Sequence, residues 1–205
     1  QHSFEKLEWQ SYLEESVALY RQTSNREGLA LVLAFYRWIL LTWRTHLPPN
    51  SAVDGINTQA MSEESLAIVD AISSTSLPEN LWVKARVLLW IGEYTDDGEW
   101  LSRAQIPKIE EAAALFHELL DQEGEIQGTV ALGYIALKDG DGTSAHSNFL
   151  QALDLARTLK SKHALEDVLG GLGNTAYLLQ DFVKMEIYFR QVQKITTETT
   201  GEFHN

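Results

Sequence analysis

Histidine and carboxylate side chains are the candidates for metal-binding or acid–base chemistry, because the chain contains no cysteine. No two histidines are separated by three or four residues, so none forms a His-Glu-x-x-His zinc motif. One of them precedes Glu118 in a predicted helix, without a second ligand nearby in the sequence. The six are His2, His46, His117, His146, His163 and His204. The sequence therefore predicts no metal site.

The acidic residues show no catalytic or calcium-binding arrangement either. The run Asp139–Ser144 is similar to the start of a calcium loop, but Leu150 occupies the twelfth position, where a bidentate glutamate is required. We interpret the run as an inter-helix turn. Adjacent carboxylates diverge on a helix and cannot act on one bond, which applies to Glu63-Glu64, Asp96-Asp97 and Glu110-Glu111. Only a site assembled from residues distant in sequence would make this chain an enzyme, so we expect a non-catalytic protein.

Two further motifs are missing from the sequence. No serine lies in a Gly-x-Ser-x-Gly motif, and no glycine-rich phosphate loop ending in Gly-Lys-Ser/Thr occurs. We therefore expect no cofactor, and a role in binding rather than in catalysis.

The overall charge narrows the choice of partner. The chain carries 29 acidic and 16 basic side chains, a net charge of −13. Such a surface repels nucleic-acid phosphates and anionic lipids, so neither is an expected partner, and a basic partner is favoured. The longest apolar stretch, Leu29–Trp43, contains Arg37 and is too short for a membrane span. No basic segment followed by an apolar run opens the sequence, which favours the cytoplasm.

A pattern recurs after 40 residues in the second half of the chain. Each copy has a Leu-Gly pair, an aspartate eight residues after the glycine, and a packing residue four residues after the aspartate. A phenylalanine follows four residues later, and a small or branched residue three residues after that. The matching positions are Leu132 and Leu172, Gly133 and Gly173, Asp141 and Asp181, Ala145 and Met185, Phe149 and Phe189, and Ala152 and Val192. This spacing predicts antiparallel helix pairs, with glycine where the second helix crosses the first closely and aspartate as the cap of the second helix.

The pattern resembles the tetratricopeptide repeat, whose signature has Leu-Gly in its first helix and an alanine followed four residues later by phenylalanine in its second. The period of 40 exceeds the standard ~34 residues, which indicates longer helices. The resemblance implies an all-α fold, a single right-handed α-solenoid of about four to five helix pairs over residues 1–205. The segment Glu14–Ala34 is similar to repeat boundaries in the long-repeat domains of bacterial signalling ATPases and maltose-regulator-like transcription activators.

The earlier repeats match less well. In the third pair, Gly92 takes the glycine position, Ala112 and Phe116 take the packing positions, and Gly124 closes the second helix. Arg37 falls at the glycine position of the second pair, so no packing role carries over to it. The predicted organisation is irregular repeats over 1–76, a third pair over 79–122, a fourth over 125–160, a fifth over 163–196 and a tail over 197–205.

The first predicted helix, over residues 4–22, looks like the second helix of a pair. We therefore expect the chain to be a piece of a longer signalling or regulatory protein.

In tetratricopeptide domains the first helices line a groove that binds a protein or peptide, and the resemblance places the partner there. Counting from the glycine gives the candidate groove residues, which are Trp38, Arg86, Glu93, Asp96, Gln127, Val130, Tyr134, Lys138, Asp167, Asn174 and Tyr177.

The six tryptophans all lie in the first half of the chain. They can fill larger gaps between irregular helices, or they can form an aromatic surface for a peptide, sugar or small apolar ligand. Trp38 and Trp100 are the candidates for the second role. A third possibility is self-association through an unfinished solenoid end, because terminal repeats need a polar cap.

Overall fold

The computed structural model describes residues 8–44, 55–75 and 77–202. Over these ranges the chain forms nine α-helices, and the only β-type pairing is one isolated bridge between Tyr94 and Trp100. The prediction of an all-α protein is confirmed. His2, His46 and His204 lie outside the described residues. The chain divides into two compact units, residues 1–108 and 109–205, and each is described by itself.

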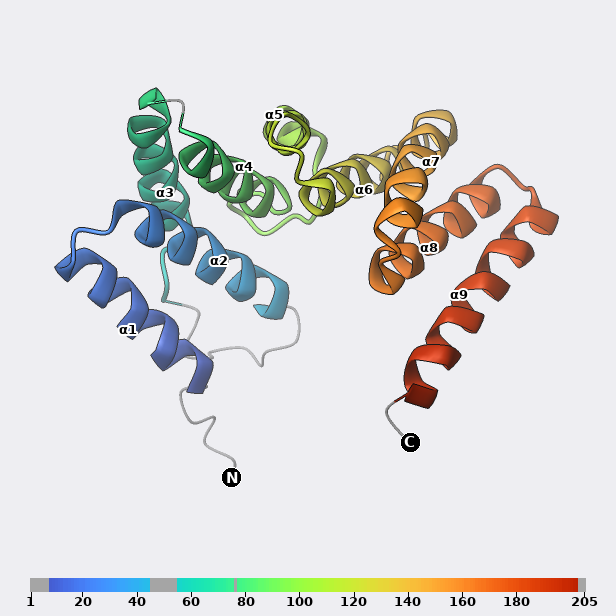
Figure 1. Cartoon of the computed structure of the whole chain (residues 1–205), viewed down its shortest axis with the longest axis horizontal. Helices are drawn as coiled ribbons and strands as arrows, with labels where there is room; N and C mark the ends of the chain where they lie inside the picture. The colour runs from blue at the N-terminus through green and yellow to red at the C-terminus, as the bar shows by residue number, and fades with distance from the viewer. Residues whose placement is uncertain (1–7, 45–54, 76, 203–205) are drawn as a thin grey trace. The chain divides into compact units, whose positions relative to one another are not determined.

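Unit 1 contains the four helices α1 (Glu8–Gln22), α2 (Arg26–Arg44), α3 (Thr58–Ile72) and α4 (Pro78–Gly92). Helix α2 packs against the other three (Figure 1). Its apolar side is buried, with Leu33 at 2 % exposure packed in the same core as Val69 of α3 and Val87 of α4. Two short 3-10 helices, Ser73–Thr75 and Arg103–Gln105, follow α3 and precede α5.

Unit 2 contains most of α5 (Ile106–Glu118) and all of α6 (Gln122–Lys138), α7 (Gly142–Leu159), α8 (Lys162–Leu178) and α9 (Phe182–Glu202). Consecutive helices from α6 to α9 pack against one another as antiparallel hairpins, and α6 also contacts α8 (Figure 1). The division between the units falls inside α5, within the predicted third pair. The single solenoid over 1–205 stays a prediction.

One type of turn connects α1 to α2 and each pair of consecutive helices from α5 to α9. The residue before the new helix's N-cap has a positive φ angle, at Ser24, Leu120, Gly140, Lys160 and Gln180. The next residue caps the new helix by accepting the N–H three residues further on, at Asn25, Asp121, Asp141, Ser161 and Asp181. Four of these caps are spaced by 20 residues, so the 40-residue period consists of two helix-and-turn units.

The backbone is closed in the same way at each of these turns. The N–H of the capping residue donates to the carbonyl five residues earlier, as from Asp141 to Ala136 at 2.9 Å and from Asp181 to Ala176 at 2.8 Å. This bond satisfies a carbonyl at the end of the preceding helix that would otherwise lack an intrahelical partner. The turns are therefore built by the backbone and one polar side chain, and four of the five do without glycine at the positive φ.

Residue size is complementary across these turns. A Cβ on Gly28 would lie 2.4 Å from the Tyr20 ring, and a Cβ on Gly124 would lie 2.4 Å from the Phe116 ring. Where the earlier helix has alanine in place of the aromatic residue, the later helix does not need glycine. Ala156 of α7, for example, is followed by Ala164 at the position equivalent to Gly124. Gly124 therefore lies in the first turn of α6 and does not close α5, in contrast to the prediction, because Leu120 adopts the positive φ that a closing glycine would supply.

Glycine also marks the helix crossings in unit 2. A Cβ on Gly133 of α6 would lie 2.8 Å from the Phe149 ring, and a Cβ on Gly173 of α8 would lie 2.8 Å from the Phe189 ring. Each glycine follows its helix's N-cap by twelve residues, as Arg37 does in α2. Gly92 is buried but follows the N-cap Leu77 by fifteen residues, which explains the looser match of the third pair.

The other predicted packing residues differ in burial along the chain. Ala112, Phe116, Ala145, Phe149, Ala152 and Leu172 are each 0 % exposed. Leu132 and Met185 are half-buried, and Phe189 is 39 % exposed on α9. Helix α9 continues to Glu202, into the predicted tail over 197–205. Within the predicted fifth pair, Thr196 donates a hydrogen bond of 2.7 Å to Glu166 of α8.

Candidate functional site

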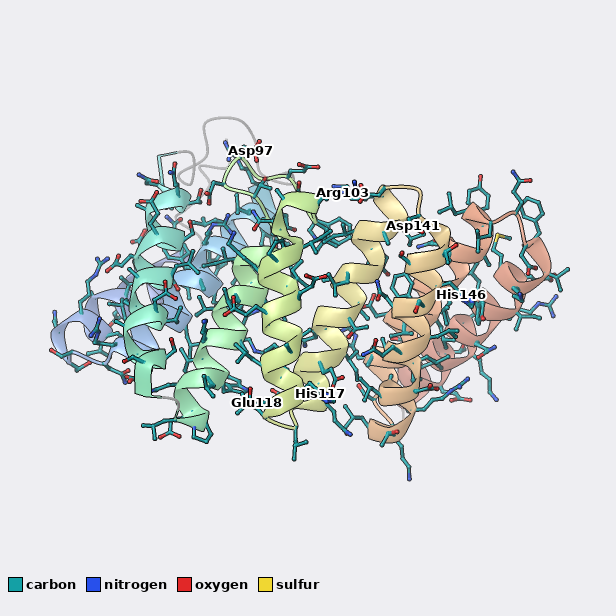
Figure 2. All side chains as sticks on the ribbon, turned by 90° about the horizontal axis from the view of Figure 1, so that it is seen from above. Asp97, Arg103, His117, Glu118, Asp141 and His146 are labelled. Atoms are coloured by element: carbon teal, nitrogen blue, oxygen red, sulfur yellow. The ribbon has the colours of Figure 1, made fainter. Side chains whose placement is uncertain are left out.

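The residues considered for metal or acid–base chemistry do not converge. Figure 2 shows His117 and Glu118 at the end of α5 and His146 on α7. The Nδ1 of His117 lies 3.2 Å from Glu125 of α6, at the surface. No group of three or more histidine and carboxylate side chains that could hold a metal ion occurs among the described residues. Asp141, in the run similar to a calcium loop, caps α7 by accepting the N–H of Ser144.

A row of aromatic and cationic side chains lies on α2 and α4. Phe35 stacks on Trp38 with ring centroids 6.0 Å apart, and it also contacts Trp90 at 5.2 Å. The guanidinium of Arg86 lies over the rings of both Trp90 and Trp82, at 5.8 and 5.3 Å from their centroids. We call these five residues the aromatic row. Four of them are half-buried and Trp82 is 37 % exposed, so the row is open to solvent along one side.

The aromatic row includes two of the residues predicted to line a groove, Trp38 and Arg86. A third, Glu93, accepts a hydrogen bond of 2.6 Å from the Trp38 indole N–H. Phe35, Trp82 and Trp90 are additional members. Their spacing in sequence, 35 with 38 and 82 with 86 and 90, places each set on one helix face and could have revealed them.

Asp96, the fourth predicted groove residue of this region, is held in place by a buried arginine. Arg37 of α2 is fully buried and donates from Nη2 to the Asp96 carboxylate and to the Tyr94 carbonyl, both at 3.0 Å. Ser62 of α3 donates to the same carboxylate oxygen at 3.1 Å. Burial lowers the pKa of Arg37, and Asp96 opposes that effect. Asp96 therefore holds the loop after α4 onto α2 and α3, where the sequence predicted it to face a partner.

The loop after α4 also carries Trp100, the second tryptophan considered for a small ligand. Trp100 is 44 % exposed and forms the isolated bridge with Tyr94. Within the loop, the Thr95 hydroxyl donates to Asp97, and this hydrogen bond lowers the pKa of the Asp97 carboxyl. The loop is thus held by hydrogen bonds between its own residues. It places Trp100 beside Tyr94, whose carbonyl accepts a hydrogen bond from Arg37.

A second candidate surface lies on α6 and α8 in unit 2. The Tyr134 hydroxyl of α6 donates to Asp167 of α8 at 3.0 Å, and burial and then this carboxylate raise the pKa of the tyrosine. Four of the residues predicted to line a groove are exposed, namely Gln127, Lys138, Asn174 and Tyr177. Val130 differs: it is 6 % exposed and belongs to the core shared by α6, α7 and α8.

Gly170 of α8 occupies the position equivalent to Val130, 40 residues later. A Cβ at Gly170 would meet no atom within 4 Å, so nothing in the described protein requires a glycine there. Glycine inside a helix costs roughly 0.5–1 kcal/mol relative to alanine. This face is therefore open to close approach by another molecule between Asp167 and Asn174.

No described helix combines the length and apolar character that crossing a bilayer requires. No protein-family model matches the chain, and the search of curated proteins returns no match to it.

Proposed function

We propose that this protein is a non-catalytic binding module of tetratricopeptide-like helix pairs, which recognises a protein or peptide partner as part of a larger signalling or regulatory protein. The observation that carries the proposal is the aromatic row on α2 and α4. Tryptophan and arginine are the residues that most often dominate the energy of protein interfaces. The 20-residue repetition of the helix turns supports the tetratricopeptide-like arrangement, and a right-handed solenoid is part of the proposal.

The expected partner is a peptide segment that combines basic and apolar side chains. Aromatic faces bind aliphatic groups and cations, and Glu93 beside Trp38 adds a carboxylate at one end of the row. The net charge of −13 attracts a basic segment over a distance set by the salt concentration. The α6–α8 face of unit 2 is a separate candidate surface, where Gly170 would admit a partner's backbone or bulky side chain.

Selection from a phage-displayed library of random peptides tests the proposal. We expect enriched peptides that are basic and apolar, and we expect Trp38→Ala and Trp82→Ala to weaken their binding by tenfold or more. Trp43→Ala is the matched control, because Trp43 is 51 % exposed on the same helix as Trp38 but lies outside the aromatic row. Peptides that bind the three variants equally well would contradict the assignment of this surface.

Self-association is a second candidate, favoured by the outer side of α9. No residue of this helix with a described side chain is buried, and Phe182, Val183 and Ile187 are 57 %, 71 % and 49 % exposed. The helix carries three basic and three acidic residues in a chain of net charge −13, so two copies would meet there with little repulsion. Sedimentation at tens of micromolar should then show a dimer that Val183→Glu dissociates, whereas a mass of 23.1 kDa throughout would exclude it.

A small-molecule effector is the remaining alternative for Trp38 and Trp100. The indole N–H of Trp38 already donates a hydrogen bond to Glu93, so a small ligand could contact Trp38 only through its ring face. Titrations of tryptophan fluorescence with peptides and with sugars distinguish peptide binding from binding of a small effector. Under our proposal, the fluorescence should change with peptides and not with sugars.

A further inference from the structure

A cavity of about 350 Å³ lies between α1, α2 and the start of α3 in unit 1. Its walls are mostly apolar, with Val17 from α1, Leu33 from α2 and Met61 from α3, while Ile56 contributes from just before α3. This volume lies in the range of small-molecule sites, which combine apolar walls with a few polar groups. None of the aromatic-row residues lines it, so the cavity is separate from the surface proposed for peptides.

Glu14, a carboxylate that lines the cavity, is held in place by two neutral hydrogen-bond donors. Glu14 accepts from the Tyr36 hydroxyl at 3.3 Å and from Gln10 Nε2 at 3.1 Å. Tyr36 is 2 % exposed, and burial followed by the nearby Glu14 charge raises the pKa of its phenol to about 12. The tyrosine therefore stays neutral at physiological pH. These two bonds fix the position of the Glu14 carboxylate at the wall of the cavity.

A second acceptor lies one helical turn before Glu14. Gln10 is 3 % exposed, and its Oε1 is buried without a hydrogen-bond partner. Gln10 does not line the cavity itself, but it is bonded directly to the carboxylate that does.

An exposed ion pair also lines the cavity. Arg21 of α1 and Glu64 of α3 lie 2.6 Å apart, with side chains 54 % and 38 % exposed. Pairs this exposed contribute roughly 0–1 kcal/mol, so a ligand can displace this one at little cost. Arg21 follows Glu14 by seven residues, about 10 Å along the helix. A ligand with a head at Glu14 and an apolar body extending toward Arg21 would fill the space between them.

We propose that this cavity binds a small organic amine, with its ammonium group on Glu14 and its apolar body against Val17, Leu33 and Met61. The ammonium supplies a charged donor for the Glu14 carboxylate. Two carboxylates, Glu14 and Glu64, line the cavity against one cation, Arg21, which pairs with Glu64, so the lining disfavours an anionic ligand. An uncharged ligand would gain only the apolar walls. The proposal goes beyond peptide recognition, and it stands on different residues.

Binding of 2-phenylethylamine, measured by calorimetry on the whole chain, tests the proposal, with 2-phenylethanol as the uncharged analogue of nearly equal size. We expect saturable binding of the amine and at least tenfold weaker binding of the alcohol. Glu14→Gln should weaken amine binding by tenfold or more. Glu15→Gln, the next residue and exposed, should leave it unchanged. Amine binding should also change the fluorescence of Trp9, which packs edge-on against the cavity residue Tyr36 with ring centroids 6.4 Å apart. A Trp9→Phe variant should lack that part of the fluorescence change.

Equal affinity for the amine and the alcohol, or equal affinity of the Glu14→Gln and Glu15→Gln variants for the amine, would overturn the proposal. So would the absence of amine binding at millimolar concentration. If Glu14→Gln unfolds, Ala60→Phe replaces it, since Ala60 is an exposed lining residue and the larger side chain should block the cavity. Trp38→Ala should leave amine binding unchanged, which separates this test from that of the peptide surface.

Discussion

A single arginine, Arg37, occupies the position in α2 that glycine fills in α6 and α8. Removing its partner would leave a buried charge, which costs about 3–5 kcal/mol when both groups are buried. Because the Asp96 side chain is 51 % exposed, we expect Asp96→Ala to lower the free energy of unfolding by less, about 2 kcal/mol. Urea titration followed by circular dichroism measures the change.

Two further variants make the Asp96 experiment specific. Arg37→Met removes the charge together with the Nε and Nη1 groups that have no partner, so it should be neutral or stabilising. Asp70→Ala, which removes an exposed carboxylate from α3, should change stability by less than about 0.5 kcal/mol. A loss in Asp70→Ala equal to that in Asp96→Ala would show that the effect is not due to the buried pair.

Tyr36 predicts a specific dependence of stability on pH. Its folded-state pKa is raised to about 12, above the usual 10.0, so the folded protein retains the phenolic proton while the unfolded chain loses it. This contribution to stability is complete below pH 10 and is lost as the pH rises toward 12. We expect the thermal stability of Tyr36→Phe to fall less steeply than that of the wild type over this interval.

The control for the pH experiment is Tyr12→Phe, because Tyr12 is 66 % exposed on α1. Its stability should follow the wild-type curve between pH 9 and pH 12, within the error of the melting temperature. Parallel curves for the wild type and Tyr36→Phe would contradict the assignment of the raised pKa.

At the scale of the helices, the turn between α5 and α6 gives a test of size complementarity. A Cβ at Gly124 would overlap the Phe116 ring, so we expect Gly124→Ala to destabilise the protein by about 1–3 kcal/mol. In the Phe116→Ala background the same change should cost less, because the pair then matches Ala156 and Ala164 of the later turn. A double-mutant cycle measures this coupling.

Gly170→Ala provides the opposite sign as a control. This glycine lies within α8 and has open space around its Cβ position, so alanine there should stabilise the protein by roughly 0.5–1 kcal/mol. Destabilisation by Gly170→Ala would show that the added methyl group meets a neighbouring atom, which would contradict the open space at this position.

The sequence predicted the helices of unit 2 well because caps, crossing glycines and apolar faces all repeat there with one spacing. The positive φ of Leu120, Lys160 and Gln180 could not be foreseen, since no side-chain property of these residues favours it. The turn imposes it through backbone hydrogen bonds on both sides. Gly124 was misassigned for this reason, as a helix end was sought at a glycine.

The candidate surfaces were predictable only in part. Counting along the helices found Trp38, Arg86 and Glu93, which the structure brings to one region, because outward positions on helices follow from periodicity alone. Burial of Val130 depends on α8 packing beside α6, which no local pattern reports. The cavity beside Glu14 joins residues up to 50 positions apart, so it required the tertiary arrangement of α1, α2 and α3.

At the scale of the whole molecule, the acidic charge opposes the compact state through repulsion between its own side chains. The acidic excess is found in both units. Residues 1–108 carry 9 basic and 14 acidic side chains, a net charge of −5, and residues 109–205 carry 7 basic and 15 acidic side chains, a net charge of −8. Raising NaCl from about 10 to about 150 mM shortens the Debye length from ~30 to ~8 Å. We expect the melting temperature to rise by a few degrees over that range.

Charge-reduced variants check the origin of the salt effect. Glu110→Gln combined with Glu118→Gln removes two exposed carboxylates from α5, and the melting temperature should then depend less on salt. A melting temperature that falls with added NaCl would mean that attractive ion pairs outweigh the repulsion. Such a result would direct attention to Arg37 and Asp96 as the dominant electrostatic contribution.

The 20-residue spacing of the caps at Asp121, Asp141, Ser161 and Asp181 sets a rule for changes in chain length. An insertion of one complete helix pair keeps every later cap, crossing glycine and phenylalanine in phase. An insertion of a few residues inside a helix instead rotates the following apolar positions toward water and moves the next capping residue into a helix interior. Unit 2 can therefore grow or shrink only in whole modules, and a gene encoding it would tolerate duplications of that size and reject most others.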